Sequence, residues 1–236
     1  MVKAKETFIL VMPVLNEESY IEKSISSWSS VINSFPGSEI LVIEGGSKDK
    51  TRLILERLTK TLDFIRVVDQ KDKGHGNALI QGYNIATKSS HEWVFQTDGD
   101  GHHHPSDFEN LWEKRGTSDF ILGHRRKRQE PLYRLTLSHL ASLWIFILFG
   151  KYIKDPNVPF KLMRKKYLDK ILKKVPKGVF APNIFLSILA KKDGQNLYHV
   201  PVTHINRKKA TSNTPTILKG ASRSFLELLL FALVEF

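Results

Sequence analysis

Apolar runs alternate with stretches of helical periodicity along the first hundred residues. Residues 8–14 (FILVMPV) form a continuous apolar run of strand length. In the following residues 17–31, the apolar positions recur every three or four residues, as on one face of a helix. The alternation then continues. Further strands are predicted over residues 39–43, 64–68 and 93–96, and further helices over 48–61 and 77–87.

This alternation with short connections predicts an α/β fold, in which helices flank a mostly parallel central sheet. Such sheets bind ligands at the carboxyl ends of their strands. Residues 1–212 are expected to form this domain. Residues 213–236 are expected to form a C-terminal amphipathic helix, whose apolar run over 226–234 contacts the core, a partner protein or a membrane surface.

Composition and charge narrow the possible partners. The formal net charge is +12 and the sequence pI is about 9.7, which indicates an anionic partner such as nucleic acid, acidic lipid or a phosphorylated substrate. The chain has no cysteine, which excludes disulfides and thiolate metal sites. The longest apolar run, residues 140–149, is shorter than the ~20 residues that a membrane span needs. It is expected to pack in the core or to dock on a membrane surface.

Two carboxylates one residue apart follow the predicted strand over 93–96. Asp98 and Asp100, separated by Gly99, can reach the same divalent cation from the end of that strand. Carboxylate oxygens suit Mg²⁺ or Mn²⁺. An Asp-Gly pair alone is often only a surface turn. The motif therefore indicates a metal site only in combination with the other segments at the strand ends.

Three other predicted strands also end in polar segments. These are residues 13–18 (PVLNEE), 44–51 (EGGSKDKT) and 73–78 (KGHGNA). Their glycines permit a close approach of the backbone to a ligand, and the N-terminus of the helix predicted over 77–87 favours an anion. Each segment alone is a common loop, but the four strand-end segments together indicate one ligand site.

The four segments resemble the motifs of family 2 glycosyltransferases, nucleotide-sugar-dependent enzymes with the GT-A (Rossmann-like) fold. Residues 12–18 are similar to the family's V-P-x-x-N-E-E, and 44–51 to its D-D-G-S-x-D-x-T. Residues 73–78 are similar to K-G-x-G-x-A, and 98–100 to D-x-D. Glu44 and Gly45 stand where the family has two aspartates, which leaves the identity of the nucleotide base open.

The resemblance implies roles for individual residues. A carboxylate such as Glu44 would accept a hydrogen bond from the base or ribose, and Mg²⁺ or Mn²⁺ would be the cofactor on the diphosphate. The implied nucleotide-sugar-binding residues are Pro13, Leu15, Asn16, Glu17, Glu44, Gly46, Ser47, Lys73, Asp98 and Gly99. The implied metal ligands are Asp98, Asp100 and His102, with the alternative that His102, His103 and His104 only shape the loop or support the metal ligands from behind.

The second half of the chain suggests the acceptor. Arg125, Arg134 and Ser138 match the Arg, Arg and Ser positions by which polyprenyl-phosphate glycosyltransferases, such as dolichyl-phosphate mannose synthase, hold the lipid phosphate. Guanidinium groups are well suited to bind a phosphate. The alternative is that the sequence HRRKRQ over 124–129 is a solvated basic loop.

Two further segments resemble family motifs imperfectly. Residues 155–162 (DPNVPFKL) are similar to D-x-x-x-G-F-R-x, with Pro159 in place of glycine. Residues 207–212 (RKKATS) are similar to R-x-x-G-x-S, whose arginine contacts the diphosphate. The resemblance therefore implies four catalytic residues, which are Asp100, Arg125, Arg134 and Arg207.

One absence bears on the acceptor. Family members that act on hydroxyl groups usually carry an acidic general base after the segment that begins at Asp155, but residues 177–184 (KGVFAPNI) contain no carboxylate. A hydroxyl loses a proton as it attacks, whereas a phosphate oxygen is already anionic. The gap favours a phosphate acceptor, unless Asp155 or Asp193 serves as the base.

The predicted function is therefore metal-dependent, inverting transfer of a hexose from a GDP- or UDP-sugar to a polyprenyl (dolichyl-type) phosphate. The enzyme is expected to be cytoplasmic and peripheral on the membrane. The alternative enzyme transfers the sugar to a hydroxyl group in polysaccharide or lipopolysaccharide assembly. A nucleic-acid-binding module is disfavoured, because no interleaved basic and aromatic motif is present. A catalytically inactive scaffold remains an alternative because of Gly45, Pro159 and Ala210.

Overall fold

The centre of the sheet is formed by the first half of the chain. In the computed structural model, which describes residues 6–126, 132–203, 205 and 214–235, all seven residues of β1 (Phe8–Val14) are buried. β1 pairs in parallel with β2 (Glu39–Glu44) and β4 (Trp93–Thr97), and β2 pairs in parallel with β3 (Ile65–Asp69). The carboxyl ends of these strands therefore lie along one edge of the sheet.

The second half of the chain extends the sheet beyond β4. β6 (Phe160–Arg164) is inserted antiparallel between β4 and β5 (Phe120–Arg126), and β7 (Tyr198–Thr203) pairs in parallel with β5. Over the described residues the sheet has seven strands in the order β3-β2-β1-β4-β6-β5-β7. The prediction of an α/β fold with a mostly parallel sheet is confirmed.

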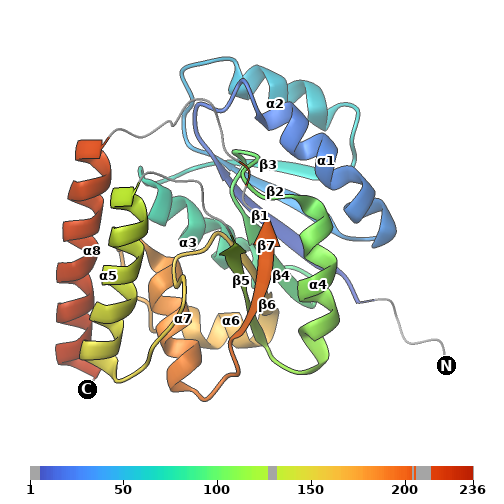
Figure 1. Ribbon diagram of the computed structural model, residues 1–236. Coiled ribbons are helices and arrows are strands. Elements are labelled where there is room, and N and C mark those ends of the chain that lie inside the picture. Colours follow the sequence, from blue (N-terminus) through green and yellow to red (C-terminus); the bar gives the residue numbers. More distant parts are fainter. Residues whose placement is uncertain (1–5, 127–131, 204, 206–213, 236) are drawn as a thin grey trace.

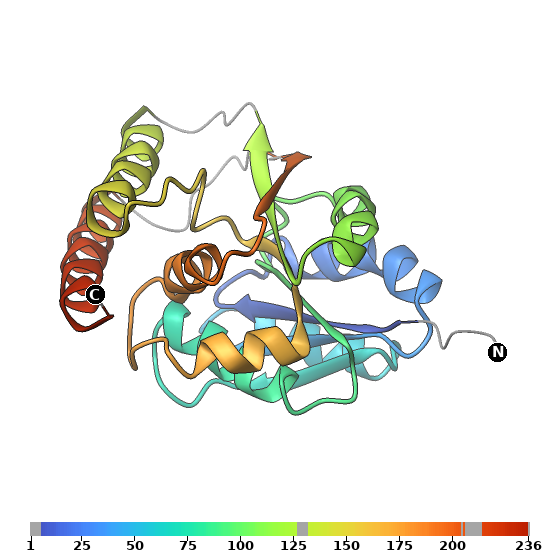
Figure 2. The same ribbon diagram turned by 90° about the horizontal axis from the view of Figure 1, so that it is seen from below.

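Helices cover both faces of the sheet (Figures 1 and 2). On one face, Trp28 of α1 packs against Phe95 of β4 and Phe108 of α4. On the other face, α3 packs on β1 and β2 and contacts α6 and α7. The helices are α1 (Ile21–Ser34), α2 (Thr51–Thr59), α3 (His75–Ala86), α4 (Phe108–Trp112), α5 (Leu132–Phe149), α6 (Lys165–Leu172), α7 (Pro182–Lys192) and α8 (Thr214–Glu235), and two 3₁₀ turns span Pro105–Asp107 and Glu113–Gly116.

α5 and α8 lie side by side at one end of the molecule (Figures 1 and 2). The indole Nε1 of Trp144 on α5 donates to the backbone oxygen of Phe225 on α8 at 3.3 Å, and the two rings pack edge to face. Among the described residues, no helix is long and apolar enough to cross a bilayer. The domain boundary after residue 212 stays a prediction.

Two helices begin later than their periodicity predicts. α1 starts at Ile21 rather than near residue 17, and α2 starts at Thr51 rather than near residue 48. In both cases the preceding backbone N–H groups bond to the opposite loop instead of entering a helix: Glu17 N–H donates to Thr51 Oγ1 at 2.8 Å and Lys50 N–H donates to Glu18 Oε2 at 2.9 Å. These loops lie at the ligand-binding edge of the sheet.

Candidate active site

The two aspartates share the turn that follows β4, next to the end of β1. Gly99 allows this closeness, since a Cβ at its position would lie 2.6 Å from Cγ2 of Val14. Asp98 Oδ1 accepts a hydrogen bond from Gln96 Nε2 at 3.2 Å. Asp100 Oδ1 accepts one from the backbone N–H of His102 at 3.0 Å. The turn is therefore held at both carboxylates.

His102 lies beside Asp100 in a defined tautomer. Its Nδ1 is 2.7 Å from the carbonyl oxygen of Ile205, and a carbonyl only accepts, so Nδ1 carries the proton. In the neutral ring Nε2 then presents a lone pair, and Nε2 lies 3.5 Å from Oδ2 of Asp100. A neutral imidazole whose other nitrogen is bonded to a carbonyl is a usual arrangement for a metal ligand.

The acidic turn suits a cation that binds together with phosphate. Burial and the neighbouring Asp100 carboxylate raise the pKa of Asp98 well above its usual range, and a divalent cation would offset that repulsion. Within the described residues, no three His, Cys, Asp or Glu side chains are grouped so as to hold a metal ion by themselves. Mg²⁺ is commonly held by one or two carboxylates plus substrate phosphates, and Asp98 and Asp100 fit that ligand set.

The loops after β1 and β2 are joined by hydrogen bonds into one unit. Asn16, at a positive φ of 54°, donates its backbone N–H to Ser47 Oγ at 2.9 Å, and its Oδ1 accepts from Lys48 N–H at 2.8 Å. Leu15 projects from this unit with 52% of its surface exposed. The unit thus combines fixed polar backbone with an exposed apolar side chain, which suits one face of a nucleoside.

Glu44 shapes this unit rather than facing solvent. Its two carboxylate oxygens accept from the backbone N–H groups of Gly46, at 3.0 Å, and Ser47, at 2.7 Å, and the residue is 2% exposed. At Gly45 a Cβ would lie 3.1 Å from Oε1 of Gln70. The amide of Gln70, which the motifs do not single out, therefore lies against the position where the family has its second aspartate.

The segment before α3 borders both the loop unit and the acidic turn. Lys73 is exposed there, and Gly74 has a φ of 108°, which favours glycine. Gln70 Nε2 donates to the carbonyl oxygen of Gly74 at 2.7 Å. His75, the first residue of α3, places Nε2 4.0 Å from Oδ1 of Asp98. The positive end of the α3 dipole therefore lies close to the acidic turn, where an anion would be stabilised.

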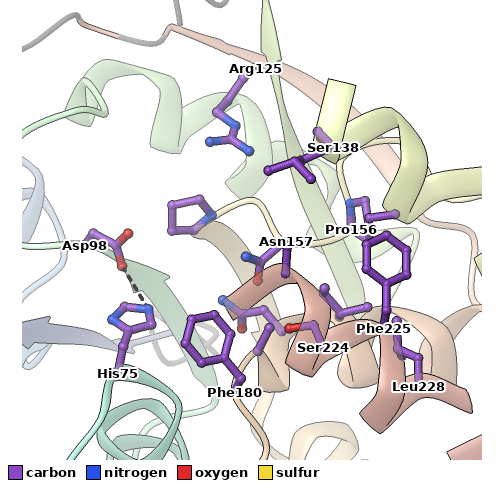
Figure 3. Close-up of a pocket in the computed structure, with 17 residues that line it drawn as sticks. His75, Asp98, Arg125, Ser138, Pro156, Asn157, Phe180, Ser224, Phe225 and Leu228 are labelled. Carbon is purple, nitrogen blue, oxygen red and sulfur yellow. Dashed lines mark ion pairs between the residues drawn. The ribbon is translucent and has the colours of Figure 1, made fainter. Parts of the chain in front are cut away.

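A cavity of about 320 Å³ extends from the acidic turn to helices α5 and α8 (Figure 3). Asp98 and His75 lie on one side, and apolar residues of α8 lie across from them. Arg125 of β5 and Ser138 of α5, both predicted to hold a phosphate, line the space between. The residues that line the cavity include His75, Asp98, Arg125, Ser138, Phe180, Asn183, Phe225 and Leu228.

Phe180 and its neighbour Val179 connect the N-terminus of α3 to α8. A Cβ at Gly76 of α3 would lie 2.3 Å from the carbonyl oxygen of Val179, and a Cβ at Gly220 of α8 would lie 2.4 Å from the Phe180 ring. The backbone N–H of Phe180 donates to Glu227 Oε2 of α8 at 2.9 Å. Phe180 also lines the cavity, so α8 is fixed in place as one of its walls.

Arg125 is oriented by a buried ion pair. Its Nε and Nη2 donate to Oδ2 and Oδ1 of Asp155 at 2.8 and 2.6 Å, and both side chains are largely buried. Asp155 has a positive φ of 51°. The fully buried Lys161 donates to the carbonyl oxygens of Pro156 and Val158 at 3.1 and 2.6 Å. Lys161 thus holds the loop that presents Asp155.

Lys161 should make stability depend on pH. Burial lowers the pKa of Lys161 from 10.5 to about 7, although Asp155 opposes this shift. Between these values the unfolded chain binds more protons than the native state, so the free energy of unfolding should rise with pH, by up to about 1.4 kcal/mol per unit. Urea unfolding at pH 6, 7.5 and 9 should show this rise, and Lys161→Met should have a smaller one. Parallel curves for the two proteins would contradict the assignment.

Most of the sequence matches a known family. A sequence model described as Glycosyl transferase family 2 covers residues 9–176, which include the acidic turn, the joined loops and Arg125. The chain belongs to glycosyl transferase family 2. The prediction of a glycosyltransferase with that family's fold is confirmed.

Several relatives of this family 2 glycosyltransferase have been assigned activities. The chain is 23% identical over 211 residues to an undecaprenyl-phosphate mannosyltransferase of Micrococcus luteus, and the alignment covers 86% of each chain. It is 21% identical over 237 residues to a UDP-N-acetylglucosamine–dolichyl-phosphate N-acetylglucosaminyltransferase of Methanococcus voltae, with 92% and 93% of the two chains covered. The resemblance to polyprenyl-phosphate glycosyltransferases is therefore present over most of the chain.

Solved structures show the same fold. The glycosyltransferase superposes on glucosyl-3-phosphoglycerate synthase from Mycobacterium tuberculosis with a TM-score of 0.73 and 16% identity, over 97% of this chain and 79% of that one. That structure was determined in complex with Mn²⁺ and UDP-glucose. The similarity establishes the GT-A-like architecture of the glycosyltransferase.

The structure brings only some of the predicted site residues together. Asp98, Arg125 and Ser138 line one cavity, and Asp100 and His102 adjoin Asp98. Arg134 lies on α5 with its side chain outside the described part, and Arg207 lies outside the described residues. The motifs missed His75, Phe180, Asn183 and the α8 residues that line the cavity. Of these, His75 could have been found, since it lies within the K-G-x-G segment.

Proposed function

We propose that this family 2 glycosyltransferase transfers a hexose from a nucleotide sugar to the phosphate of a polyprenyl phosphate, with inversion. The observation that carries the proposal is the cavity. It joins the acidic turn at Asp98 to Arg125 and Ser138, and these to the apolar walls of α5 and α8 (Figure 3). A ligand with a phosphate group and an apolar chain would fit the basic and then the apolar part of this cavity.

The donor would lie across the strand ends on the N-terminal side of the cavity. The joined loops that contain Asn16 and Ser47 would bind the nucleoside, and Lys73 and the N-terminus of α3 would lie near the diphosphate. Arg207, which lies outside the described residues, is proposed from the family resemblance alone to contact the diphosphate. UDP is bound by the structural neighbour and named in one relative, so a UDP-sugar is the first donor to test and a GDP-sugar the second.

Asp98 and Asp100, with His102 beside them, would hold Mg²⁺ or Mn²⁺ against the donor diphosphate. Such a cation supplies positive charge where the leaving group becomes negative. His75 stands next to Asp98, so its ring would border the same region. The two carboxylates thus serve binding and charge balance, rather than proton abstraction.

The cavity is suited to an acceptor that needs no general base. Among the lining residues that the structure describes, Asp98 is the sole carboxylate, and it is assigned to the cation. A phosphate oxygen is anionic near neutral pH and can attack without losing a proton. Arg125, with Ser138 and Arg134, would hold that phosphate opposite the departing diphosphate.

The prenyl chain would leave the cavity along α5 and α8 toward a membrane surface. Both helices expose large apolar side chains, which would insert into the interfacial region of a bilayer. On α5 these are Leu140, Leu143, Phe146 and Ile147, and on α8 they are Leu218, Leu226, Leu229, Leu230, Leu233 and Val234. We therefore place the enzyme peripherally on the cytoplasmic membrane face.

The decisive experiment offers labelled UDP- and GDP-sugars with Mn²⁺ or Mg²⁺ and a short polyprenyl phosphate, in detergent and in vesicles that contain anionic lipid. Label should enter the lipid fraction only when metal is present. Metal-dependent donor hydrolysis without lipid labelling would move the acceptor to a hydroxyl group. An absence of turnover with every donor would favour a scaffold.

A further inference from the structure

Three buried polar side chains lie in a row behind Asp98, on three different elements. Gln96 is on β4, Asn183 is on α7 and Tyr83 is on α3, and their exposed fractions are 0%, 2% and 0%. None belongs to the motifs discussed above. Burying polar groups is unfavourable unless each finds a hydrogen-bond partner, so this row needs a structural or functional reason.

The three side chains form a continuous chain of hydrogen bonds that ends on the carboxylate. Tyr83 Oη donates to Asn183 Oδ1 at 2.7 Å, and Asn183 Nδ2 donates to Gln96 Oε1 at 3.1 Å. Gln96 Nε2 then donates to Asp98 Oδ1 at 3.2 Å. The chain runs from the last turn of α3 to the acidic turn, and it passes through the first turn of α7 at the wall of the cavity.

The direction of the chain follows from the form of Asp98 that binds a cation. A cation-binding carboxylate is ionised and only accepts, so Gln96 must turn its NH₂ group toward Asp98 and its oxygen toward Asn183. Asn183 must then present its NH₂ group to Gln96 and its oxygen to the Tyr83 hydroxyl, which can donate. Every amide in the row has one orientation that satisfies all partners, and the reverse orientation would set an oxygen against Asp98.

We infer that Tyr83, Asn183 and Gln96 are positioning residues that hold Oδ1 of Asp98, and with it the plane of the carboxylate, in the orientation required to bind the divalent cation. The inference rests on the proposed function, because that function assigns the cation to Asp98. Hydrogen-bonded partners behind a metal ligand commonly change metal affinity or activity by 10–100-fold when they are removed. A buried polar network with every member satisfied also specifies one arrangement, since partial satisfaction is unfavourable.

Two substitutions break the chain at different points. Asn183→Asp keeps the shape but removes the NH₂ group that donates to Gln96 Oε1. Gln96 would then flip to donate to the new carboxylate, which places its oxygen against Asp98. Tyr83→Phe removes the terminal donor and leaves the amides able to keep their orientation. The first change should therefore have the larger effect on the cation.

The test is a titration of the purified full chain with Mn²⁺, with UDP present, in which free Mn²⁺ is followed by electron paramagnetic resonance. We expect about 10–100-fold weaker Mn²⁺ binding for Asn183→Asp and a smaller loss for Tyr83→Phe. Tyr167→Phe is the matched control. Tyr167 lies on α6, away from the cavity, and its hydroxyl donates to Asp193 Oδ2 at 3.4 Å. The Mn²⁺ affinity of Tyr167→Phe should equal that of the wild type.

The outcomes separate the two proposals. Suppose that Asn183→Asp and Tyr83→Phe bind Mn²⁺ as tightly as the wild type does, while their thermal stability falls. The row of side chains would then be only structural, and this inference would be wrong. Should Asn183→Asp fail to fold, Tyr83→Phe still decides between these results. If the wild type and Asp98→Asn bind Mn²⁺ with the same affinity, the cation assignment itself fails, and the positioning role fails with it.

Discussion

Replacing Asp100 with asparagine is expected to lower sugar transfer about 10³-fold, in line with the loss of one strong electrostatic contact in an active site. The asparagine has the same shape, and its Oδ1 can still accept from the His102 N–H that lies 3.0 Å from the aspartate. The change therefore removes the negative charge and leaves the turn intact. The measurement is the initial rate of label transfer from the accepted donor to polyprenyl phosphate in saturating Mn²⁺.

A control is needed for nonspecific effects of losing one carboxylate. Asp63→Asn, in the exposed loop between α2 and β3, makes the same chemical change far along the chain from the acidic turn and should leave the rate unchanged. Thermal unfolding should be similar for both variants. A rate for Asp100→Asn within about threefold of wild type would remove Asp100 from the proposed machinery.

The first half of the fold follows closely from the sequence. β1 was predicted with its observed bounds, because seven consecutive buried apolar residues leave little alternative to a central strand. The helices were predicted in the right places, but α1 and α2 begin three to four residues late. Their first turns compete with the bonds between the loops, such as Glu17 N–H to Thr51 Oγ1, and local periodicity carries no information about that competition.

The second half of the sheet could not be predicted in the same way. β6 contains Lys161, which is fully buried between apolar neighbours, so the segment lacks the pattern of a central strand. Its antiparallel insertion between β4 and β5 depends on pairing across more than sixty residues, for example Phe95 with Leu162. The local periodicity of a segment does not indicate which distant strand it pairs with.

The site was predicted in outline because strand ends converge. Asp98 directly follows β4 and Arg125 lies near the end of β5, and the sheet brings them to one cavity. The partners of these residues could not be predicted. Asp155, which orients Arg125, and Asn183, which stands behind Gln96, come from loops and helices whose approach is decided by packing. Glu44 is the clearest example, since its carboxylate is occupied by its own loop.

Arg125→Lys is expected to lower kcat/KM for the polyprenyl phosphate about 10²-fold, chiefly through KM, while metal-dependent donor hydrolysis changes little. Lysine keeps the positive charge, but it cannot donate through two atoms to Asp155 as Nε and Nη2 do at 2.8 and 2.6 Å. The phosphate would then meet an ammonium group in an unfixed position. The expected loss of stability is about 2 kcal/mol, from hydrogen bonds to a charged group.

Two matched variants separate acceptor binding from loss of the ion pair. Arg164→Lys alters another Arg–Asp pair, in which Nε lies 2.6 Å from Asp119 Oδ1 at the outer end of β6, and it should leave KM for the acceptor unchanged. Asp155→Asn breaks the Arg125 pair from the other side and keeps the guanidinium group in the cavity wall. If Arg125 binds phosphate, Asp155→Asn should retain more affinity for the acceptor than Arg125→Lys does, because it removes a negative charge beside the phosphate. Equal losses in both variants would mean that Arg125 only supports the loop at Asp155, and the acceptor phosphate would then have to be held by other residues.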